Sequence, residues 1–467
     1  MGSGRARALA SLGLLFCMTP LHCVYADTET VLPVRAFSGL AVDDRHRHVF
    51  IAQGDSITVV DFDGHIVTSI ENQPGAAGML VDSAHGVLYV ALSAADAVSE
   101  IKTRTLVETR RRSLDLGVCP WTLAITHRLL WFGFLCGNGC DSCTRRPHIG
   151  GIGSLNPHRG DIVAYDLYTS GFEVPFYFPL LASTRRARNT LISVEGGLSP
   201  TDFYRYSVLP GGSLHPEVHV IAPDEYYTLD VAIEPDGLRV VTGAVAGQTG
   251  RIPGLKVFAV ADFSYQFSYV TPGSNVPAVA ISSDGQLVAG GLSDIFSGGG
   301  AYIFIFASGD SNPIGVYDFS SDGSTLYQRG LAFDRKAAKL FAVTATSASA
   351  TLHILDDPRQ PPPTTTTTTT TTTSSSTVTT TTIDYGPCTA ARLGYPCGTS
   401  AAYCYCAASC SGNCAPVCVQ FTSQTSCQTD ADCTSIPGGV CVEDPHVACS
   451  TTSGSCTSYG ICVQPCP

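Results

Sequence analysis

Seven copies of one short pattern fill most of the chain and restrict its fold more than any other feature. Each copy is an apolar strand, a polar turn, a second apolar strand, a polar gap and a further strand. The first strands end near positions 43, 82, 126, 183, 234, 282 and 334, so successive copies lie 39 to 57 residues apart. Self-similarity at this period is typical of solenoid and propeller folds.

The turns of these copies carry hairpin signals. In the first copy, apolar residues 39–43, 49–52 and 57–61 are separated by short polar stretches. Later copies place Pro-Asp-Gly at 235–237 and Ser-Asp-Gly at 283–285 between two β-branched runs. Asp-Gly between such runs predicts a tight hairpin, because glycine adopts the positive φ that the turn requires.

Seven such units predict an all-β fold, a seven-bladed β-propeller over residues 34–357. A β-sandwich is the main alternative, but it would not repeat seven times at this period. The expected innermost strands contain small residues, which suits blades that converge on a narrow axis: Ala41, Ala124, Ala232, Ala280 and Ala332.

The second unit contains a more specific motif. Residues 88–91 read Leu-Tyr-Val-Ala, and residues 96–103 read Asp-Ala-Val-Ser-Glu-Ile-Lys-Thr. This stretch resembles the YVTN repeat family, whose units read Tyr-Val-Ala/Thr-Asn, a polar turn and Val-Ser-Val-Ile-Asp. Leu92 replaces the family's asparagine and Glu100 its valine, so only this blade matches well. The resemblance implies a secreted or surface propeller related to the NHL and lactonase-like group, and it transfers no catalytic residue.

The amino terminus predicts export. Arg5 and Arg7 precede an apolar stretch over residues 9–21, and Ala26 ends a plausible cleavage site. Residues 1–26 are therefore expected to be a signal peptide, because the apolar stretch is too short for a membrane anchor and Pro20 interrupts it. No later stretch is apolar enough to be expected to span a bilayer. We expect a secreted or extracellular protein, or a periplasmic or cell-surface one if the source is a bacterium.

A tract of proline, threonine and serine divides the chain. It covers residues 358–383 and cannot bury apolar surface, so it is expected to be a disordered spacer. Fourteen of the 20 cysteines follow it, in residues 384–467. With an even cysteine count, little apolar mass and an exported context, this region is expected to be a small disulfide-rich module.

The connectivity of that module is not deducible from the sequence. Its disulfide candidates are Cys388, Cys397, Cys404, Cys406, Cys410, Cys414, Cys418, Cys427, Cys433, Cys441, Cys449, Cys456, Cys462 and Cys466. The second half, with Cys-Gln-Thr-Asp-Ala-Asp-Cys at 427–433, resembles small Dickkopf-like cysteine repeats. Asp430 and Asp432 would suit calcium, but an Asx-turn between bridged cysteines is the preferred interpretation.

Four further cysteines lie in the third repeat, at Cys119, Cys136, Cys140 and Cys143, with His148 nearby. Their spacing would suit zinc, but export favours oxidised thiols, so two disulfides are the preferred interpretation. They would fix an insertion over residues 136–160 that lengthens blade three at one propeller face, where recognition usually occurs.

No catalytic constellation stands out, and the catalytic residues are unknown. The cluster Asp43, Asp44, His46 and His48 reads as a solvated hairpin rather than a metal site. No cofactor is expected, with structural calcium or zinc as open alternatives. The formal net charge of −12 argues against nucleic acid as a partner, and Arg110, Arg111 and Arg112 read as a solvated strand edge.

These features favour a secreted, non-enzymatic binding or adhesion protein. Its ligand would be an extracellular protein or glycan, bound by a loop face of the propeller and by the disulfide-stapled tail. The alternative is a secreted lactonase-like or other hydrolytic propeller enzyme with a metal in its channel and the tail as a targeting module. Acidic or histidine side chains converging on the axis would favour the enzyme, whereas an axis lined by Ala, Val and Ser would favour binding.

Overall fold

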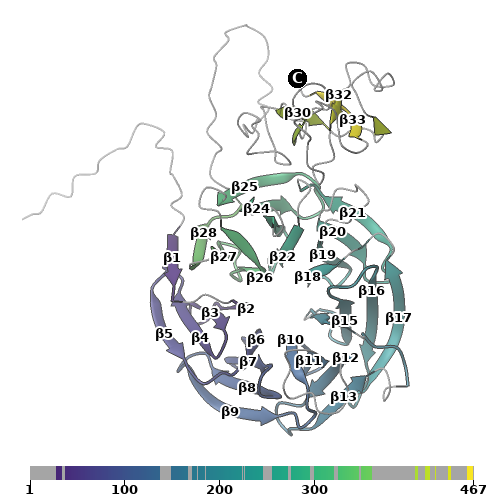
Figure 1. The fold of residues 1–467 in the computed structure, drawn as a ribbon. Helices are drawn as coiled ribbons and strands as arrows, with labels where there is room; N and C mark the ends of the chain where they lie inside the picture. Colours follow the sequence, from purple (N-terminus) through teal and green to yellow (C-terminus); the bar gives the residue numbers. More distant parts are fainter. Residues whose placement is uncertain are drawn as a thin grey trace, which may run out of the picture.

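A computed structural model describes residues 28–359, with gaps at 34–36, 137–148, 167–170, 176, 185, 223–224, 226, 246–254, 272–274, 295–298, 320–323 and 347–348. Farther along the chain it describes the backbone of five short strands. Over residues 28–359 the described part forms seven four-stranded antiparallel sheets around one axis (Figure 1). The predicted seven-bladed β-propeller is confirmed.

Each blade is an up-and-down sheet whose first strand lies nearest the axis (Figure 1). Blade one contains β2 (Gly39–Asp43), β3 (His48–Gln53), β4 (Ser56–Asp61) and β5 (Ile66–Ile70). Blade two contains β6 (Ala76–Asp82), β7 (Val87–Leu92), β8 (Ala97–Lys102) and β9 (Val107–Ser113). Blade three contains β10 (Cys119–Thr126), β11 (Leu129–Cys136), β12 (Ile149–Leu155) and β13 (Ile162–Asp166).

The next three blades repeat this order. Blade four contains β14 (Pro179–Ala182), β15 (Thr190–Glu195), β16 (Thr201–Val208) and β17 (Leu214–Ala222). Blade five contains β18 (Thr228–Ile233), β19 (Arg239–Ala244), β20 (Leu255–Ala259) and β21 (Tyr265–Tyr269). Blade six contains β22 (Asn275–Ile281), β23 (Leu287–Asp294), β24 (Gly299–Ala307) and β25 (Pro313–Phe319).

Blade seven joins the two ends of the propeller. It contains β26 (Thr325–Phe333), β27 (Lys339–Ala345), β28 (Ala350–Asp356) and, as its outermost strand, β1 (Thr28–Leu32). β1 runs antiparallel to β28, from Thr28 opposite Ile354 to Leu32 opposite Ala350. The strand therefore closes the ring non-covalently. The expected domain start at residue 34 leaves this strand out, since its pairing partner lies more than 300 residues away.

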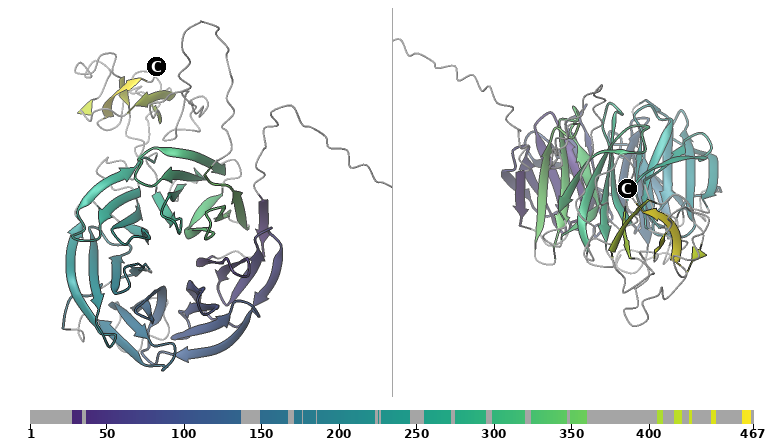
Figure 2. Two further views of the ribbon diagram at one scale, coloured as in Figure 1. Left: turned by 180° about the vertical axis from the view of Figure 1, so that it is seen from behind. Right: turned by 90° about the horizontal axis from the view of Figure 1, so that it is seen from above.

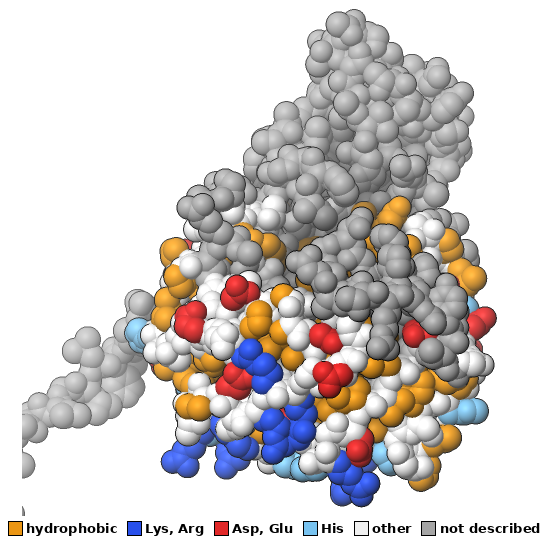
Figure 3. All heavy atoms as spheres, turned by 60° about the horizontal axis from the view of Figure 1, so that its bottom comes forward, with side chains coloured by type: hydrophobic (Ala, Val, Ile, Leu, Met, Phe, Trp, Pro, Cys, Tyr) orange, Lys and Arg blue, Asp and Glu red, His pale blue; other side chains and the backbone are white. Residues whose placement is uncertain are grey.

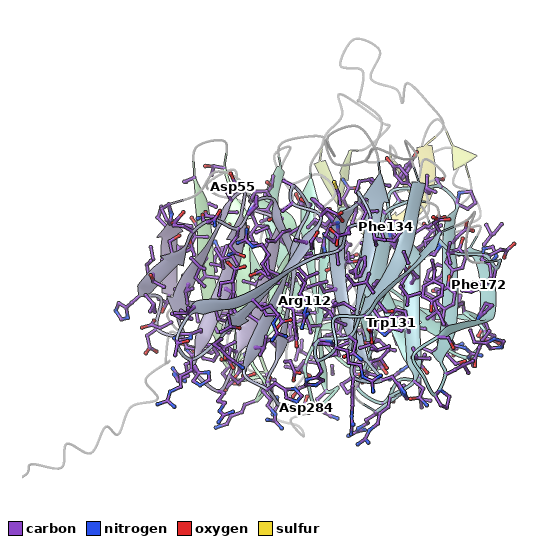
Figure 4. The ribbon with its side chains drawn as sticks, turned by 90° about the horizontal axis from the view of Figure 1, so that it is seen from below. Asp55, Arg112, Trp131, Phe134, Phe172 and Asp284 are labelled. Carbon is purple, nitrogen blue, oxygen red and sulfur yellow. The ribbon has the colours of Figure 1, made fainter. Side chains whose placement is uncertain are left out.

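The alternating strand directions give the disc two unlike faces. Turns between the first and second strands of each blade, such as the one at Asp284, lie on one side, here called the hairpin face. Connections between the second and third strands, such as the one at Asp55, lie on the opposite side, the loop face. Figure 4 shows Asp55 and Asp284 at opposite edges of the disc, and Figure 2 shows the disc from behind and edge-on.

The long connection of blade three is shorter than expected. Residues 149–155 lie in β12, which pairs with β11 from Leu130 opposite Leu155 to Cys136 opposite Ile149. Only residues 137–148 separate the two strands in sequence, and they lie outside the described residues. The sequence of β12 does not predict a strand, because it is rich in glycine. In the structure Gly151 and Gly153 leave room for the rings of Phe134 and Phe132 on the neighbouring strand.

Each pair of neighbouring blades shares an apolar cluster, and the clusters together follow the whole ring. The cluster between blades seven and one contains Leu32 of β1 together with Ile51, Phe62 and Phe341. The rings of Phe62 and Phe341 lie 4.8 Å apart between centroids. Packing of adjacent sheets thus supplies the core, as is usual for radial β repeats.

Near the axis the inner strands approach so closely that side chains do not fit between them. A Cβ added to Gly39 would lie 2.5 Å from the carbonyl oxygen of Ala77 in the next blade. One added to Gly78 would lie 2.3 Å from the carbonyl oxygen of Trp121, again one blade farther. Backbone atoms of a central strand have little freedom to move away, so these glycines set the spacing of blades one to three.

Five short strands lie in the cysteine-rich region: β29 (Tyr405–Ala408), β30 (Pro416–Gln420), β31 (Ser426–Cys427), β32 (Val440–Val442) and β33 (Gly460–Pro465). Their backbone register places Cys406 opposite Cys418 and Cys441 opposite Cys462. Of the expected spacer, Pro358 is buried and Arg359 pairs with Asp284 of blade six, and residues 360–383 lie outside the described residues. Nowhere in the described chain is there a helix long and apolar enough for a membrane crossing.

Closure by β1 predicts an unequal effect of two neighbouring truncations. Leu32 is 3% exposed, whereas Val31 is 68% exposed. Leu32→Ala should lower the free energy of unfolding by about 2–4 kcal/mol, because it opens a cavity in the cluster that joins the first and last blades. Val31→Ala should change it by less than about 0.5 kcal/mol. Urea unfolding of both variants measures the difference, and equal effects would contradict closure by this strand.

The close approach of inner strands predicts that Gly78→Ala is destabilising. The new methyl group would meet the Trp121 backbone, so we expect a loss of about 1–3 kcal/mol in the free energy of unfolding. Gly196→Ala is the matched comparison, since its Cβ would meet its nearest atom at 3.2 Å. It should be less destabilising in the same urea titration. A neutral Gly78→Ala variant would show that the blades can move apart.

Candidate functional site

The axis of the propeller contains a small well formed mainly by residues with apolar side chains. It is lined by inner-strand residues of blades two to five, with a volume of about 200 Å³: Leu80, Leu123, Ala124, Leu181, Ala182, Ser183, Val231, Ala232 and Ile233. Most of them come from the ends of the inner strands next to the hairpin face. Two alanines expected near the axis, Ala124 and Ala232, are among them. The well is smaller than typical ligand pockets of about 300–1,000 Å³.

Nearer the loop face, a buried carboxylate links two blades at the axis. Asp230 of β18 is 7% exposed. Its Oδ1 accepts a hydrogen bond from the Val231 backbone N–H at 2.9 Å, and its Oδ2 accepts one from Val279 of blade six at 2.9 Å. The carboxylate therefore accepts hydrogen bonds from two buried backbone N–H groups, one in β18 and one in β22, and so satisfies both of them.

An arginine extends across the axis toward this carboxylate. In β26 the pairing with β27 shifts between Leu326 and Leu331, and Arg329 adopts a φ of 56° there. Arg329 Nη1 lies 3.4 Å from the Trp121 carbonyl oxygen in blade three, and its guanidinium lies 5.7 Å from the Trp121 ring centroid. The preceding Gln328 donates to the Leu229 carbonyl oxygen of blade five. Blade seven thus contacts blades three and five directly.

Burial perturbs both charged groups. It raises the pKa of Asp230 to about 7, although the Val279 and Val231 N–H groups and the Arg329 charge oppose the shift. Burial also lowers the pKa of Arg329, and Asp230 partly restores it. The Arg329 Nε atom is buried and has no hydrogen-bond partner among the described residues. We call Asp230, Arg329 and Gln328 the axial belt.

The axial belt is a structural link between blades. The Asp230 carboxylate oxygens are both occupied by backbone donors, and Arg329 contacts Trp121. Within the described residues, no group of three or more His, Cys, Asp or Glu side chains is arranged to hold a metal ion. In this part of the chain the axis holds a small well, with the buried Asp230 carboxyl group and the Arg329 guanidinium nearer the loop face.

The histidine-rich turn of blade one is an ordered bridge between blades. Asp43 is fully buried. Its carboxylate accepts a hydrogen bond from the Arg45 backbone N–H at 3.1 Å, and its Oδ2 lies 2.6 Å from His46 Nδ1. His46 Nδ1 also lies 3.1 Å from Thr103 Oγ1, and His48 Nδ1 lies 3.1 Å from the Thr103 carbonyl oxygen, both in blade two. The turn is therefore less solvated than its sequence predicts. Asp44 accepts the Arg335 N–H from blade seven.

The arginine run lies where the sequence predicts. Arg110, Arg111 and Arg112 belong to the outermost strand of blade two, and the first two are exposed. Arg111 pairs with Glu108 at 2.8 Å, and Arg112 with Glu100 at 3.1 Å. These charges neutralise each other locally.

The cysteine predictions fall largely outside the described residues. Cys119 begins β10, is 9% exposed and lies opposite Leu135 in the register with β11. That position is next to Cys136, whose backbone ends β11. The side chains of Cys136, Cys140, Cys143 and the tail cysteines are not among the described ones. The disulfides stay a prediction.

Sequence reasoning missed the axial belt. The only local signal is an acidic residue within the apolar run 229–233 and a Gln-Arg-Gly insertion at 328–330 before an apolar strand. Neither residue type identifies a partner by itself. Asp230, Gln328 and Arg329 come together only because their blades meet at the axis of the closed ring.

No protein-family model matches the sequence, and no curated protein is significantly similar to it. Solved structures match by fold. Kuenenia stuttgartiensis hydrazine synthase is 13% identical with a TM-score of 0.51, and the match covers 69% of this chain and 96% of that chain. KlHsv2 with loop 6CD replaced by a Gly-Ser linker is 11% identical with a TM-score of 0.44, covering 68% and 97%.

The seven sheets define the class of protein, a seven-bladed β-propeller, and nothing narrower. At 13% identity the first match supports the fold alone. As many as 1425 solved chains are similar, so the fold is too widespread to indicate an activity.

The raised pKa of Asp230 predicts a pH dependence of stability. Between the unfolded pKa near 3.8 and the folded pKa of about 7, the folded state binds the extra proton, so stability must fall as pH rises through this window. Asp230→Asn removes this term, and its unfolding midpoint should decline less than that of the wild type between pH 4.5 and 7.5. Urea titrations at several pH values compare the slopes. Parallel profiles would show that Asp230 stays ionised throughout.

Proposed function

We propose that this chain is a secreted, non-enzymatic binding protein. The observation that carries the proposal is the nature of the axis: a small well formed mainly by residues with apolar side chains, with Asp230 and Arg329 engaged in contacts between blades. A propeller enzyme requires reactive groups that converge on an accessible site. Surfaces of the disc are then the places left for function, and propellers display their connecting loops there.

Architecture supports the same proposal. The longest connection in blade three by sequence is 137–148, and β11 and β12, which it joins, meet it at the loop face. We propose that a protein or glycan ligand is recognised at this face. The sequence of residues 1–26 supports export, and that of 358–383 supports a spacer to a disulfide-stapled module at 384–467. Two modules on one spacer would act at raised effective concentration on a shared surface. The resemblance of residues 88–103 to YVTN repeats supports placement near the NHL and lactonase-like propellers.

The lactonase-like alternative requires a different arrangement of side chains at the axis. It needs metal ligands from several blades, and the described residues provide no such group. Burial raises the pKa of Asp230 at the axis to about 7, but both of its oxygens already accept backbone hydrogen bonds.

Full-length protein secreted from an oxidising compartment tests the proposal. Elemental analysis should find less than about 0.1 equivalent of zinc or calcium after dialysis, because no described group is built to retain either ion. Lactone and ester substrates should not be turned over, whereas arrays of glycans and extracellular proteins should give saturable binding. One equivalent of retained metal together with hydrolysis would overturn the proposal in favour of the enzyme.

A further inference from the structure

One sector of the hairpin face carries exposed cations that no carboxylate neutralises. They lie in the turns of blades seven, one, two, three and four, or at the strand end beside a turn: Arg335, Lys336, Arg45, Lys102, Arg104, Arg128, Arg159, Arg186 and Arg188. All are exposed, and in the described part of the chain none has an ion-pair partner. We call this set the cationic arc. Figure 3 shows Lys and Arg side chains gathered along the lower rim of the propeller.

Elsewhere on the described propeller, lysine and arginine are compensated. On outer strands, Arg111 pairs with Glu108 at 2.8 Å and Arg205 with Glu217 at 3.1 Å. Lys256 pairs with the buried Glu225 at 2.7 Å. The unpaired cations are therefore concentrated in one place, on a chain whose formal net charge is −12.

The rest of the hairpin face has the opposite charge. The turns of blades five and six carry exposed Asp236, Asp262 and Asp310, and Asp284 pairs with Arg359. Within the arc, exposed Asp63 pairs with Arg47, and exposed Asp161 lies in the same turn as Arg159. Cations predominate over the turns of these five blades, whereas carboxylates predominate over those of blades five and six. A segregated arrangement of this kind produces a directional field that attracts anions to one sector.

Hydrogen bonds between blades hold the arc in place. The Arg188 carbonyl oxygen of blade four accepts the His127 N–H of blade three at 3.0 Å. The Arg335 N–H donates to Asp44, and the turn that carries Arg45 is fixed by the buried Asp43 carboxylate. The backbones that present these side chains are ordered before any ligand arrives, which reduces the entropy lost on binding.

We propose that the cationic arc binds a linear acidic glycan, a polymer whose sugars carry carboxylate or sulfate groups. This rests on the proposed function as an extracellular binding protein. Seven of the nine arc residues are arginines, whose planar guanidinium groups pair with carboxylate and sulfate through two parallel hydrogen bonds. A chain following the turns would meet these cations on successive blades without entering the axial well.

Charge and side-chain type separate this ligand from nucleic acid. Proteins that track single strands place aromatic side chains beside the cations, for stacking on the bases. In the described turns of the arc no Phe, Tyr or Trp is exposed, and the exposed aromatic rings there are histidines: His65, His85, His127 and His158. Sulfate and carboxylate groups on sugars need no stacking surface.

The test compares two matched double variants of the full chain. Arg104→Gln/Arg128→Gln removes two arc charges, and Arg110→Gln/Arg111→Gln removes two charges of the outer strand β9. Heparin and polygalacturonate serve as sulfated and carboxylated probes, with neutral dextran as the blank. The arc variant should bind both acidic probes about tenfold more weakly than the wild type, at about 0.5–1 kcal/mol per lost contact. The outer-strand variant should stay within about twofold.

Salt dependence gives a second readout. The slope of log affinity against log salt should fall by about 2 in the arc variant and remain unchanged in the control. Thermal unfolding of both variants checks that they are folded. Equal weakening of the two variants would overturn the arc as the site. Binding to duplex DNA or to phosphatidylserine vesicles without binding to either glycan would overturn the choice of ligand.

Failure of this inference is distinguishable from failure of the proposed function. A wild-type protein that binds a neutral glycan or an extracellular protein, but neither acidic probe, contradicts only the arc. A protein that retains metal and hydrolyses a substrate contradicts the proposed function, whatever the arc binds.

Discussion

Contact between neighbouring sheets is the interaction that holds this propeller together. Each blade has only four short strands, and a sheet of that size gains most of its stability by covering its faces. The apolar clusters each span two blades, so every blade depends on the one before and the one after it. A ring of such contacts is complete only if the first and last blades also meet. β1 and the Phe62–Phe341 contact provide that junction.

Convergence at the axis creates a second requirement, which glycine and the axial belt meet in different ways. Where inner strands approach backbone to backbone, as at Gly39 and Gly78, the absence of a side chain is what permits packing. Between blades five and six, a carboxylate bridges the gap by accepting two backbone N–H groups. A buried carboxylate is unfavourable without a nearby cation, and Arg329 supplies one from blade seven. The inner ring is consequently specialised for packing, which leaves the faces for recognition.

Most of the propeller could be predicted because its signals are local. The turn at Asp284 shows why: the carboxylate accepts the Gln286 N–H at 3.1 Å and Gly285 adopts a φ of 74°, so four residues encode the hairpin. β1 was not predictable in this way, since its alternating polar sequence acquires a role only beside β28. The glycine-rich β12 was mistaken for an insertion for a similar reason, because Phe132 and Phe134 complete its surface from the neighbouring strand. The axial belt and the cationic arc depend on residues from several blades, and their grouping is visible only once the ring is closed.

The pairing of the first and last strands of the propeller has a consequence for how its blades can be reordered. Thr28 lies opposite Ile354, and Asp357 donates its backbone N–H to the Ala338 carbonyl oxygen on the hairpin face. The first strand and the last described residues of the propeller are therefore neighbours in space. A short linker would join them, and the chain could be opened instead at an exposed connection between blades, such as Asn72 or Asp115. The order of the blades along this sequence is thus one of several circular permutations that would form the same ring.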